Sequence, residues 1–325
     1  MDPATCCPAP QTRDDAVRLA TTVIVEGPSS RIVASPSGSQ CPVRQRYYAR
    51  VTSGTIICVN GMVLIGVASS RRARWSAAIR MSGGSRFRCR LAYRADVSKS
   101  PLSAADTWTR ADGSKYQSGV WAEEFVVMDE KFIAKGCSVD IATPGGIAPK
   151  IDPHSMNPAV VGQENVDHFS RYLDSIAVRL AHPLVLADID GRRYDAIVIP
   201  GGHGPVEDLY KDKDMGRILA EADRAGILIA PVCHGQAALL AARGPKGEWL
   251  FAGRAMTSFS DEEEVELGTA DNAPWLLADT LRKSGARYEK GPNWGAYVVR
   301  DGNLLTGQNP ASSEPLAEAV LAALR

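Results

Sequence analysis

Cysteine is scarce in most of this 325-residue chain. Only Cys137 and Cys233 occur in residues 101–325, and the other five cysteines lie within the first hundred residues. Two cysteines cannot form a disulfide framework, and no Cys-x-x-Cys pair or cysteine–histidine cluster has the spacing of a zinc site. We therefore predict a domain without structural disulfides or a bound metal, suited to a reducing cytoplasm.

The sequence also lacks net charge, because 37 basic residues balance 37 acidic ones. This balance gives no signal for nucleic acid or an anionic membrane as a partner. No apolar run is long enough to span a bilayer. The most apolar stretch, residues 55–68, contains Asn60-Gly61, a turn pair that predicts a β-hairpin. The first residues show no basic region followed by an apolar core, so we expect no secretory signal.

The balanced charge conceals two unlike parts. Residues 1–100 contain 14 Arg and 1 Lys against 5 acidic residues, so 15 − 5 = +10, and residues 101–325 carry 22 − 32 = −10. The first part is rich in Ser, Arg, Pro and Gly and has few periodic apolar segments. We predict that residues 1–98 form an extension that is disordered or foreign to the domain, and that residues 99–325 form the folded domain.

The second part alternates between apolar runs of strand length and segments with helical periodicity. This alternation predicts an α/β fold with a mostly parallel sheet covered on both faces. The predicted strands are 137–142, 194–199, 227–232, 254–259 and 296–300, and the predicted helices are 119–135, 166–180, 212–225, 236–243, 272–284 and 315–324.

Cys233 is the leading candidate for a reactive residue. It ends the apolar run 227–232 and precedes His234, Gly235 and a predicted helix, which is the order of a nucleophile elbow with Cys in place of Ser. A helix N-terminus at this point is expected to lower the pKa of the thiol. The alternative is a small buried hydrophobic residue, but the flanking His and Gly favour the nucleophile. No histidine follows His234, which excludes a cysteine hydrolase whose histidine comes late in the chain.

Two other segments offer complementary groups. Gly201-Gly202-His203-Gly204 ends another predicted strand, and the N–H groups of Gly202 and His234 could together hold an oxyanion. On the helix 119–135, one carboxyl of Glu123-Glu124 could turn inward, where burial would raise its pKa and suit it to shuttling protons.

An acidic run, Asp261-Glu262-Glu263-Glu264, follows the predicted strand that ends at Phe259. Most of these carboxylates fit the solvated first turn of a helix, where the helix dipole favours them. One member could instead accept a hydrogen bond from His234.

Four segments, in this order, resemble the ThiJ/PfpI superfamily, which has a class I glutamine amidotransferase-like fold. They are YDAIVIPGGHGPVEDL, APVCHGQAALL, SFSDEEE and LLTGQNPASS, and the resemblance extends from about Ser103 to Leu324. The most similar branch contains glutathione-independent glyoxalases (glyoxalase III) and heat-shock chaperones. The resemblance implies a flavodoxin-like sandwich, a homodimer and an enzyme without a cofactor.

The resemblance also implies roles for individual residues. Cys233 matches the nucleophile, His234 its neighbouring base, Glu124 the buried helix glutamate and Gly202 the oxyanion glycine, next to His203. The third acid falls on Asp261 or Glu264, and Trp108 and Trp294 match the walls of a pocket. The family's apolar first strand has no counterpart, because residues 93–102 carry charges and Pro101. This predicts either a shortened strand or a foreign sequence upstream.

The leading functional hypothesis is a glyoxalase III-like lyase that converts 2-oxoaldehydes such as methylglyoxal to 2-hydroxy acids through a hemithioacetal on Cys233. The small aldehyde is the expected partner, with no nucleic acid and no membrane. One alternative is a cysteine amidase or peptidase of the same superfamily. Another is a holdase chaperone or oxidative-stress sensor with little turnover.

Overall fold

The computed structural model describes residues 46–51, 54–59, 62–66, 77–80, 86–89 and 99–324. The chain divides into two compact units, Met1–Tyr93 and Arg94–Arg325. In the first unit, β1 (Arg46–Val51), β2 (Gly54–Val59) and β3 (Met62–Gly66) form an antiparallel sheet, and β4 (Ala77–Arg80) pairs with β5 (Arg86–Cys89). Val59 pairs with Met62, so the predicted hairpin is confirmed. The predicted disorder concerns residues that are mostly outside the described ranges.

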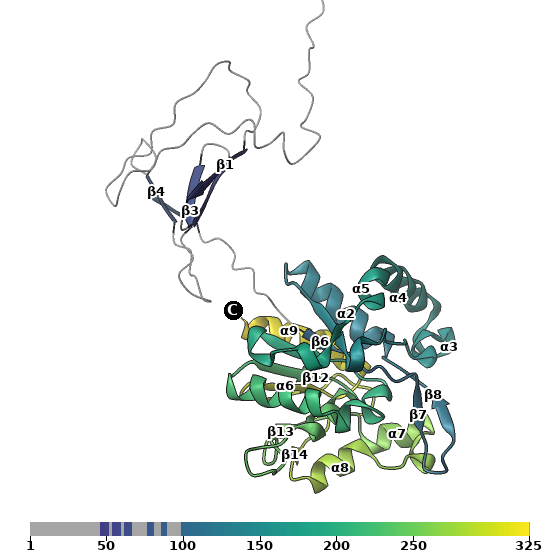
Figure 1. Ribbon diagram of the computed structural model, residues 1–325. Helices are drawn as coiled ribbons and strands as arrows, with labels where there is room; N and C mark the ends of the chain where they lie inside the picture. The colour runs from purple at the N-terminus through teal and green to yellow at the C-terminus, as the bar shows by residue number, and fades with distance from the viewer. Residues whose placement is uncertain are drawn as a thin grey trace, which may run out of the picture. The chain divides into compact units, whose positions relative to one another are not determined.

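The second unit is an α/β domain built on a seven-stranded sheet, as predicted (Figure 1). Six of its strands pair in parallel, and the seventh, the edge strand β15, is antiparallel to its neighbour β16. In spatial order the strands are β10 (Leu184–Val185), β9 (Asp140–Thr143), β6 (Lys99–Pro101), β11 (Ala196–Ile199), β12 (Leu228–Pro231), β16 (Leu304–Gly307) and β15 (Val298–Asp301).

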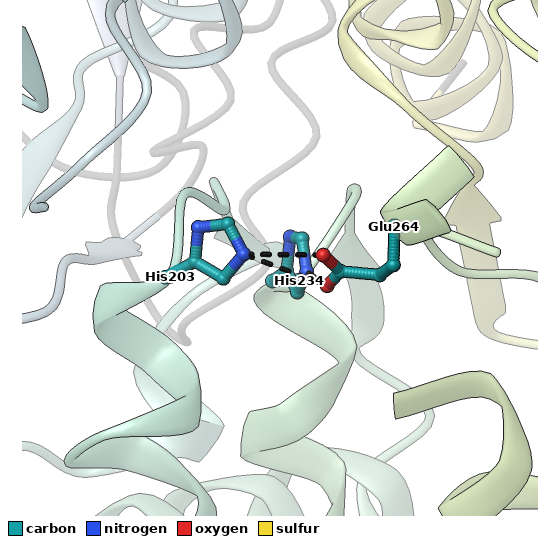
Figure 2. A group of neighbouring side chains, drawn as sticks. All are labelled: His203, His234 and Glu264. Carbon is teal, nitrogen blue, oxygen red and sulfur yellow. Dashed lines mark hydrogen bonds and ion pairs between the residues drawn. The ribbon is translucent and has the colours of Figure 1, made fainter. Parts of the chain in front are cut away.

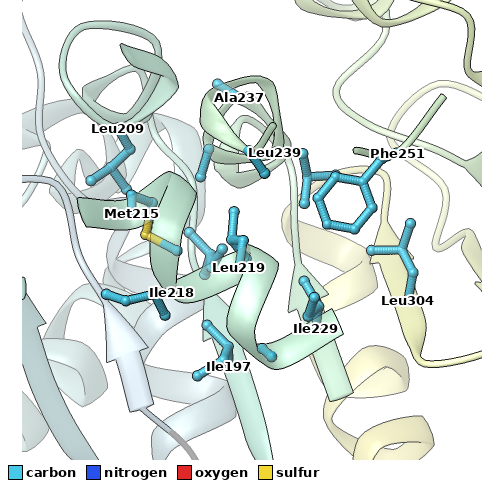
Figure 3. Close-up of a cluster of buried hydrophobic side chains, with 14 of the residues drawn as sticks. Ile197, Leu209, Met215, Ile218, Leu219, Ile229, Ala237, Leu239, Phe251 and Leu304 are labelled. Carbon is cyan, nitrogen blue, oxygen red and sulfur yellow. The ribbon is translucent and has the colours of Figure 1, made fainter. Parts of the chain in front are cut away.

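Helices cover both faces of this sheet, because its central strands are apolar on both sides. Alternate residues of β11 therefore enter different cores. Ile197 and Ile199 pack against α6 (Lys213–Arg224) and the 3-10 helix η7 (Gly235–Ala241), a cluster shown in Figure 3. Ala196 and Val198 belong to the opposite core, formed with α2 (Ala122–Ala134) and α9 (Ser313–Ala323).

Shorter elements complete the domain. The remaining helices are α3 (Pro158–Val161), α4 (Gln163–Ser175), α5 (Ala177–Ala181), α7 (Asp261–Leu267) and α8 (Leu277–Lys283), and the remaining strand pairs are β7 (Thr107–Thr109) with β8 (Lys115–Gln117) and β13 (Ala255–Met256) with β14 (Arg287–Tyr288). No helix in the described part of the chain is long and apolar enough to cross a membrane.

The central strand β6 is short, as the charged sequence around it indicated. It has three residues, and Lys99 pairs with both Asp140 of β9 and Ile197 of β11. The Lys99 side chain is fully buried, and its ammonium lies 4.7 Å from the centre of the Tyr194 ring. Burial lowers the pKa of Lys99 to about 8. A charged residue thus occupies the position of an apolar strand residue.

Two predicted elements differ from the structure. The predicted strand 254–259 is reduced to β13, which pairs with β14 outside the main sheet. Residues 257–260 instead form hydrogen bonds with the segment around Cys233. The predicted helix 236–243 is the 3-10 helix η7. This segment packs tightly under the strand ends, where Gly235 approaches the Ile199 carbonyl so closely that a Cβ would lie 2.1 Å from it.

Candidate active site

Cys233 lies on a strained turn at the carboxyl end of β12. Its φ is +59°, a left-handed conformation that is unfavourable for a residue with a Cβ. The turn is held by hydrogen bonds from the Cys233 N–H to the Gly307 carbonyl and from the Phe259 N–H to the Cys233 carbonyl. The parallel strand β11 ends beside this turn. Gly201, two residues after β11, leaves room for Cys233, since a Cβ on Gly201 would lie 2.9 Å from the Cβ of Cys233. The elbow expected from the sequence is therefore present.

Glu124 reaches this turn from the first helical turn of α2. Its carboxyl is fully buried, and its Oε2 accepts a hydrogen bond of 2.6 Å from the Gly201 N–H. Oε1 is buried without a hydrogen-bond partner among the described residues. Burial raises the pKa of Glu124 to about 8, so the side chain is a carboxylic acid at neutral pH. Glu123, its neighbour, is only half-buried.

His234 connects the thiol to a second carboxyl. Its Nδ1 lies 3.3 Å from the Cys233 Sγ, and its Nε2 lies 2.5 Å from Oε1 of Glu264. Burial would raise the pKa of Glu264, but the two histidines beside it, His234 and His203, bring it well below its usual range. Burial, followed by the neighbouring His203, lowers the pKa of His234. The neutral ring therefore donates from Nε2 to the carboxylate and turns the Nδ1 lone pair toward the thiol.

Of the two acids that the sequence left open, the structure brings Glu264 to His234. Asp261 lies one helical turn earlier on α7 and points elsewhere, because it forms an ion pair of 2.6 Å with Arg282 and accepts a hydrogen bond from the Asp279 N–H. The prediction of Asp261 as a partner of His234 is therefore wrong.

The thiol itself differs from expectation. Burial and the adjacent Glu124 raise the pKa of Cys233 well above its usual value, although the Gly202 N–H donates to the sulfur and opposes that shift. The expected lowering of the pKa is wrong, because burial and the carboxyl of Glu124 beside the sulfur both disfavour a thiolate. Cys233 is consequently a neutral thiol at rest, with a general base already in contact.

Aromatic side chains enclose the two imidazoles. Trp108 is buried and stacks on His203 at 4.5 Å between ring centroids, and His203 lies 4.4 Å from His234. On the other side, Phe259 packs on His234 at 4.7 Å, and Trp294 meets Phe259 edge-on at 5.6 Å. Trp294 remains 45% exposed. Of the two tryptophans predicted from the sequence, Trp108 is thus a buried support for His203, and Trp294 lies beyond Phe259, toward solvent.

Glu263 is a supporting residue that the sequence reading missed. It caps α7 through Ser260, and its Oε1 accepts hydrogen bonds from the Trp294 N–H and from the side-chain amides of Gln308 and Asn309. Consecutive glutamates of one helical turn therefore hold the Trp294 segment and His234. The Ser-x-x-Glu spacing of Ser260 and Glu263 is a capping-box signal that could have identified it.

Among the described residues, His203, His234 and Glu264 are close enough together to hold a metal ion, and Figure 2 shows the three side chains side by side. One donor atom from each lies within 4.8 Å of the others. A zinc ion with bonds of about 2.0–2.1 Å would hold its ligand atoms about 3.3 Å apart. The 2.5 Å separation of His234 Nε2 and Glu264 Oε1 suits a shared proton better. The predicted absence of a metal stays a prediction.

The chain is similar to several known proteins. Residues 117–323 match the model of the DJ-1/PfpI family. The chain is 32% identical to glyoxalase 3 of Candida albicans over 220 residues, which cover 66% of this chain and 92% of that protein. It is 30% identical over 223 residues to the glutathione-independent glyoxalase HSP31 of Saccharomyces cerevisiae, with the same coverage. The crystal structure of Candida albicans glyoxalase III superposes with a TM-score of 0.63 at 30% identity, covering 72% of this chain and 99% of that one.

Proposed function

Because the chain belongs to the DJ-1/PfpI family, we propose that it is a glutathione-independent enzyme that converts 2-oxoaldehydes such as methylglyoxal to 2-hydroxy acids on Cys233. The names of two similar proteins, from Candida albicans and Saccharomyces cerevisiae, support this activity. The same proposal includes a homodimer that works in the cytoplasm without a cofactor.

One observation carries the proposal. A neutral thiol lies between a neutral histidine base, His234, and a protonated carboxyl, Glu124. Addition of a thiol to an aldehyde requires a base for the sulfur and an acid for the carbonyl oxygen. The site holds both in their resting protonation states. The unpartnered Oε1 of Glu124 offers a position for the substrate oxygen.

The first step forms the hemithioacetal. Nδ1 of His234 takes the thiol proton as the sulfur of Cys233 bonds to C1 of the aldehyde. Glu124 gives its proton to the C1 oxygen, which becomes a hydroxyl. The Gly202 N–H, which already donates toward the sulfur, lies where developing negative charge would be held. This step leaves a carboxylate at Glu124 and a protonated His234 paired with Glu264.

Proton transfer between the substrate carbons follows. The Glu124 carboxylate removes the C1 proton, and the C2 oxygen takes the proton of His234, which gives an enediol. Glu124 then returns its proton to C2 while His234 accepts the proton of the C1 hydroxyl, which leaves a thioester. Water adds to C1, the C–S bond breaks and its electron pair stays on sulfur. The proton of His234 restores the thiol and one proton of the water restores Glu124. C1 is oxidised and C2 is reduced, so only water is added.

The decisive experiment measures methylglyoxal consumption without glutathione by the full chain and by Cys233→Ala, with Cys137→Ala as the matched control. Cys137 is the other free cysteine of the described domain, and it belongs to the core near α2. We expect turnover in the wild type and in Cys137→Ala, and none in Cys233→Ala. Folded wild type without turnover overturns the proposal.

A second candidate, a cysteine amidase or peptidase, is favoured by the hydrogen-bonding order of Cys233, His234 and Glu264, which suits acyl transfer. Incubation with a peptide or amide substrate, followed by mass spectrometry of the intact protein, separates the two. A stable acyl group on Cys233 without conversion of methylglyoxal would favour the hydrolase.

A further inference from the structure

We propose that Tyr116, His154 and Asp152 form a second hydrogen-bonded relay, beside the Cys233 site, whose phenol holds the C2 oxygen of the 2-oxoaldehyde. This inference rests on the proposed function. It names a catalytic group and two positioning residues that the sequence motifs do not contain.

The three side chains are joined end to end. The Tyr116 hydroxyl lies 3.0 Å from Nε2 of His154, and Nδ1 of that ring lies 3.1 Å from Oδ1 of Asp152. The carboxyl of Asp152 is buried, and it also accepts hydrogen bonds from the His154 N–H and the Ser118 hydroxyl. A buried carboxylate at Nδ1 fixes a proton there and leaves Nε2 to accept a hydrogen bond from the phenol. This is the order of groups that activates a hydroxyl in acyl-transfer triads.

The relay is adjacent to the thiol site. The ring of Tyr116 meets His203 edge-on at 6.1 Å and Trp108 edge-on at 6.2 Å, and His203 in turn contacts His234. Burial, then the charge of Asp152, raises the pKa of Tyr116, and the charge of Glu264 adds to this shift. Tyr116 is therefore close enough to sense the carboxylate that orients His234.

The backbone connects the two groups as well. The Ser118 hydroxyl, which donates to Asp152 at 2.7 Å, accepts the N–H of His203 at 3.2 Å in the loop after β11. The Val120 N–H donates to the Lys150 carbonyl, and the Asp152 N–H donates to the Val120 carbonyl. Val120 lies two residues before the start of α2, the helix that carries Glu124. Asp152 is thus fixed to both segments that form the thiol site.

The imidazole of His154 connects the buried Asp152 carboxylate to solvent. The His154 side chain is 44% exposed, whereas Asp152 is 1% exposed. With a proton on Nδ1 only, His154 accepts from the phenol. Because the His154 ring reaches solvent, water can replace the phenol at Nε2, which frees the phenol O–H to turn toward the substrate. In that state Tyr116 donates a hydrogen bond to the C2 oxygen, where negative charge develops as C1 loses its proton. No proton needs to leave the phenol.

The test compares Tyr116→Phe with Tyr194→Phe. Phenylalanine keeps the ring contacts at either position and removes only the hydroxyl. Tyr194 is a matched control because its hydroxyl also forms a side-chain hydrogen bond, in this case to the Asp140 carboxylate beside the opposite end of the parallel strands. We expect Tyr116→Phe to lower kcat for methylglyoxal by about 10²-fold, the size of losing one oxyanion donor. The primary isotope effect with C1-deuterated methylglyoxal should rise, because C1–H cleavage becomes more rate-limiting. Tyr194→Phe should change neither value.

Two further measurements separate catalysis from structure. The alkylation rate of Cys233 by iodoacetamide and the midpoint of thermal unfolding should be those of the wild type in Tyr116→Phe. His154→Gln should lower kcat by about 10²-fold, at the low end of acid–base effects, while His168→Gln should not. His168 is a matched control, since it is 45% exposed and also contacts a carboxylate, Glu130, at 2.9 Å.

The outcomes are distinct. Wild-type kcat and isotope effect in Tyr116→Phe overturn this inference and leave the proposed function standing. A fall in kcat that is matched by an equal fall in the Cys233 alkylation rate also overturns it, because the phenol would then only support the fold. Wild-type protein without turnover overturns the proposed function, and this inference with it.

Discussion

Burial is the main reason that the Cys233 thiol and the Glu124 carboxyl both resist ionisation. The Glu124 carboxyl raises the pKa of the thiol further, whereas a hydrogen bond with Cys233 partly opposes the raised pKa of Glu124. The resting site therefore keeps its protons, and a thiolate forms only when His234 takes the proton during reaction. This differs from cysteine enzymes that activate the thiol by a lowered pKa.

The raised pKa of Glu124 predicts a pH-dependent cost in stability. In the unfolded chain this carboxyl ionises near pH 4.5, whereas in the folded protein it keeps its proton to about pH 8. Between these values the unfolded state binds fewer protons, so the free energy of unfolding falls by up to about 1.4 kcal/mol per pH unit. Glu124→Gln removes this term, and the variant should gain on the wild type as pH rises from 5 to 8 in urea unfolding. Parallel pH curves for the two proteins contradict a protonated Glu124.

Neighbouring acids on α7 should differ in their effect on catalysis. Glu264→Gln removes the carboxylate that orients His234, so we expect kcat to fall by about 10²–10⁴-fold. Asp261→Asn breaks only a partly exposed pair with Arg282, and kcat should stay within about two-fold of the wild type. Steady-state kinetics on both variants provides the measurement. Equal losses in the two would show that the pairing with His234 is not what matters.

These residues show how far the sequence reaches. Cys233 and His234 were predicted from a local pattern, the elbow. The acidic helix start left Glu123 and Glu124 open, and the family resemblance selected Glu124. Asp261 and Glu264 could not be separated, because both occupy the first turn of one helix and the choice depends on how that helix packs. Tyr116 carried no signal, because its contact with His154 joins residues 38 positions apart in the sequence.

Among the elements, β6 has the most unusual sequence for its position in the sheet. A parallel strand in the middle of a sheet is normally apolar on both faces, yet β6 contains a buried lysine and Pro101. The Lys99 ammonium has no hydrogen-bond partner within the described part of the domain and rests on the Tyr194 ring. The adjoining strands β9 and β11 still pair with it, which keeps the sheet continuous.

Replacement of this lysine should stabilise the domain. The folded-state pKa of about 8 lies below the unfolded value of 10.5, so the cost of a buried charge is full below pH 8 and disappears as pH rises to 10.5. Lys99→Met, which keeps the length of the side chain, should raise the free energy of unfolding at pH 7 by about 1–3 kcal/mol. The gain should vanish near pH 10.5. A loss of stability at pH 7 would show that the ammonium stabilises the sheet.

Strands β11 and β12 and helices α2, α6 and α9 were predictable because apolar periodicity and terminal glycines mark them. The reduction of the predicted strand 254–259 to β13 was not predictable. The backbone of that segment forms hydrogen bonds with the side chains of Gln236 and of Thr306 in strand β16. Apolar periodicity indicates which residues are buried, but it does not indicate which groups hydrogen-bond to their backbone.

On the scale of the whole molecule, the second unit contains the complete set of proposed catalytic groups. Cys233, Glu124, His234 and Glu264 come from three segments that meet at the carboxyl ends of β11 and β12, where parallel sheets generally bind ligands. The family match covers the same unit. The charge difference between the two parts of the chain has no role in this account.

The fold class followed from the alternation of strands and helices, and the resemblance to the ThiJ/PfpI superfamily agrees with the matched family model. The 2-oxoaldehyde substrate was suggested by the resemblance and stays a proposal. The structure supports it through the protonation of the thiol, the carboxyl and the imidazole, which the sequence could not reveal because it depends on their mutual burial.

The most direct test follows the label from [1-¹³C]methylglyoxal in the wild type and in Cys233→Ala, without glutathione. Internal proton transfer leaves the labelled carbon in place and oxidises it, so the account predicts lactate with ¹³C in its carboxyl group from the wild type alone. Methylglyoxal that persists with folded wild type, or lactate formed equally by Cys233→Ala, would contradict a hemithioacetal on Cys233.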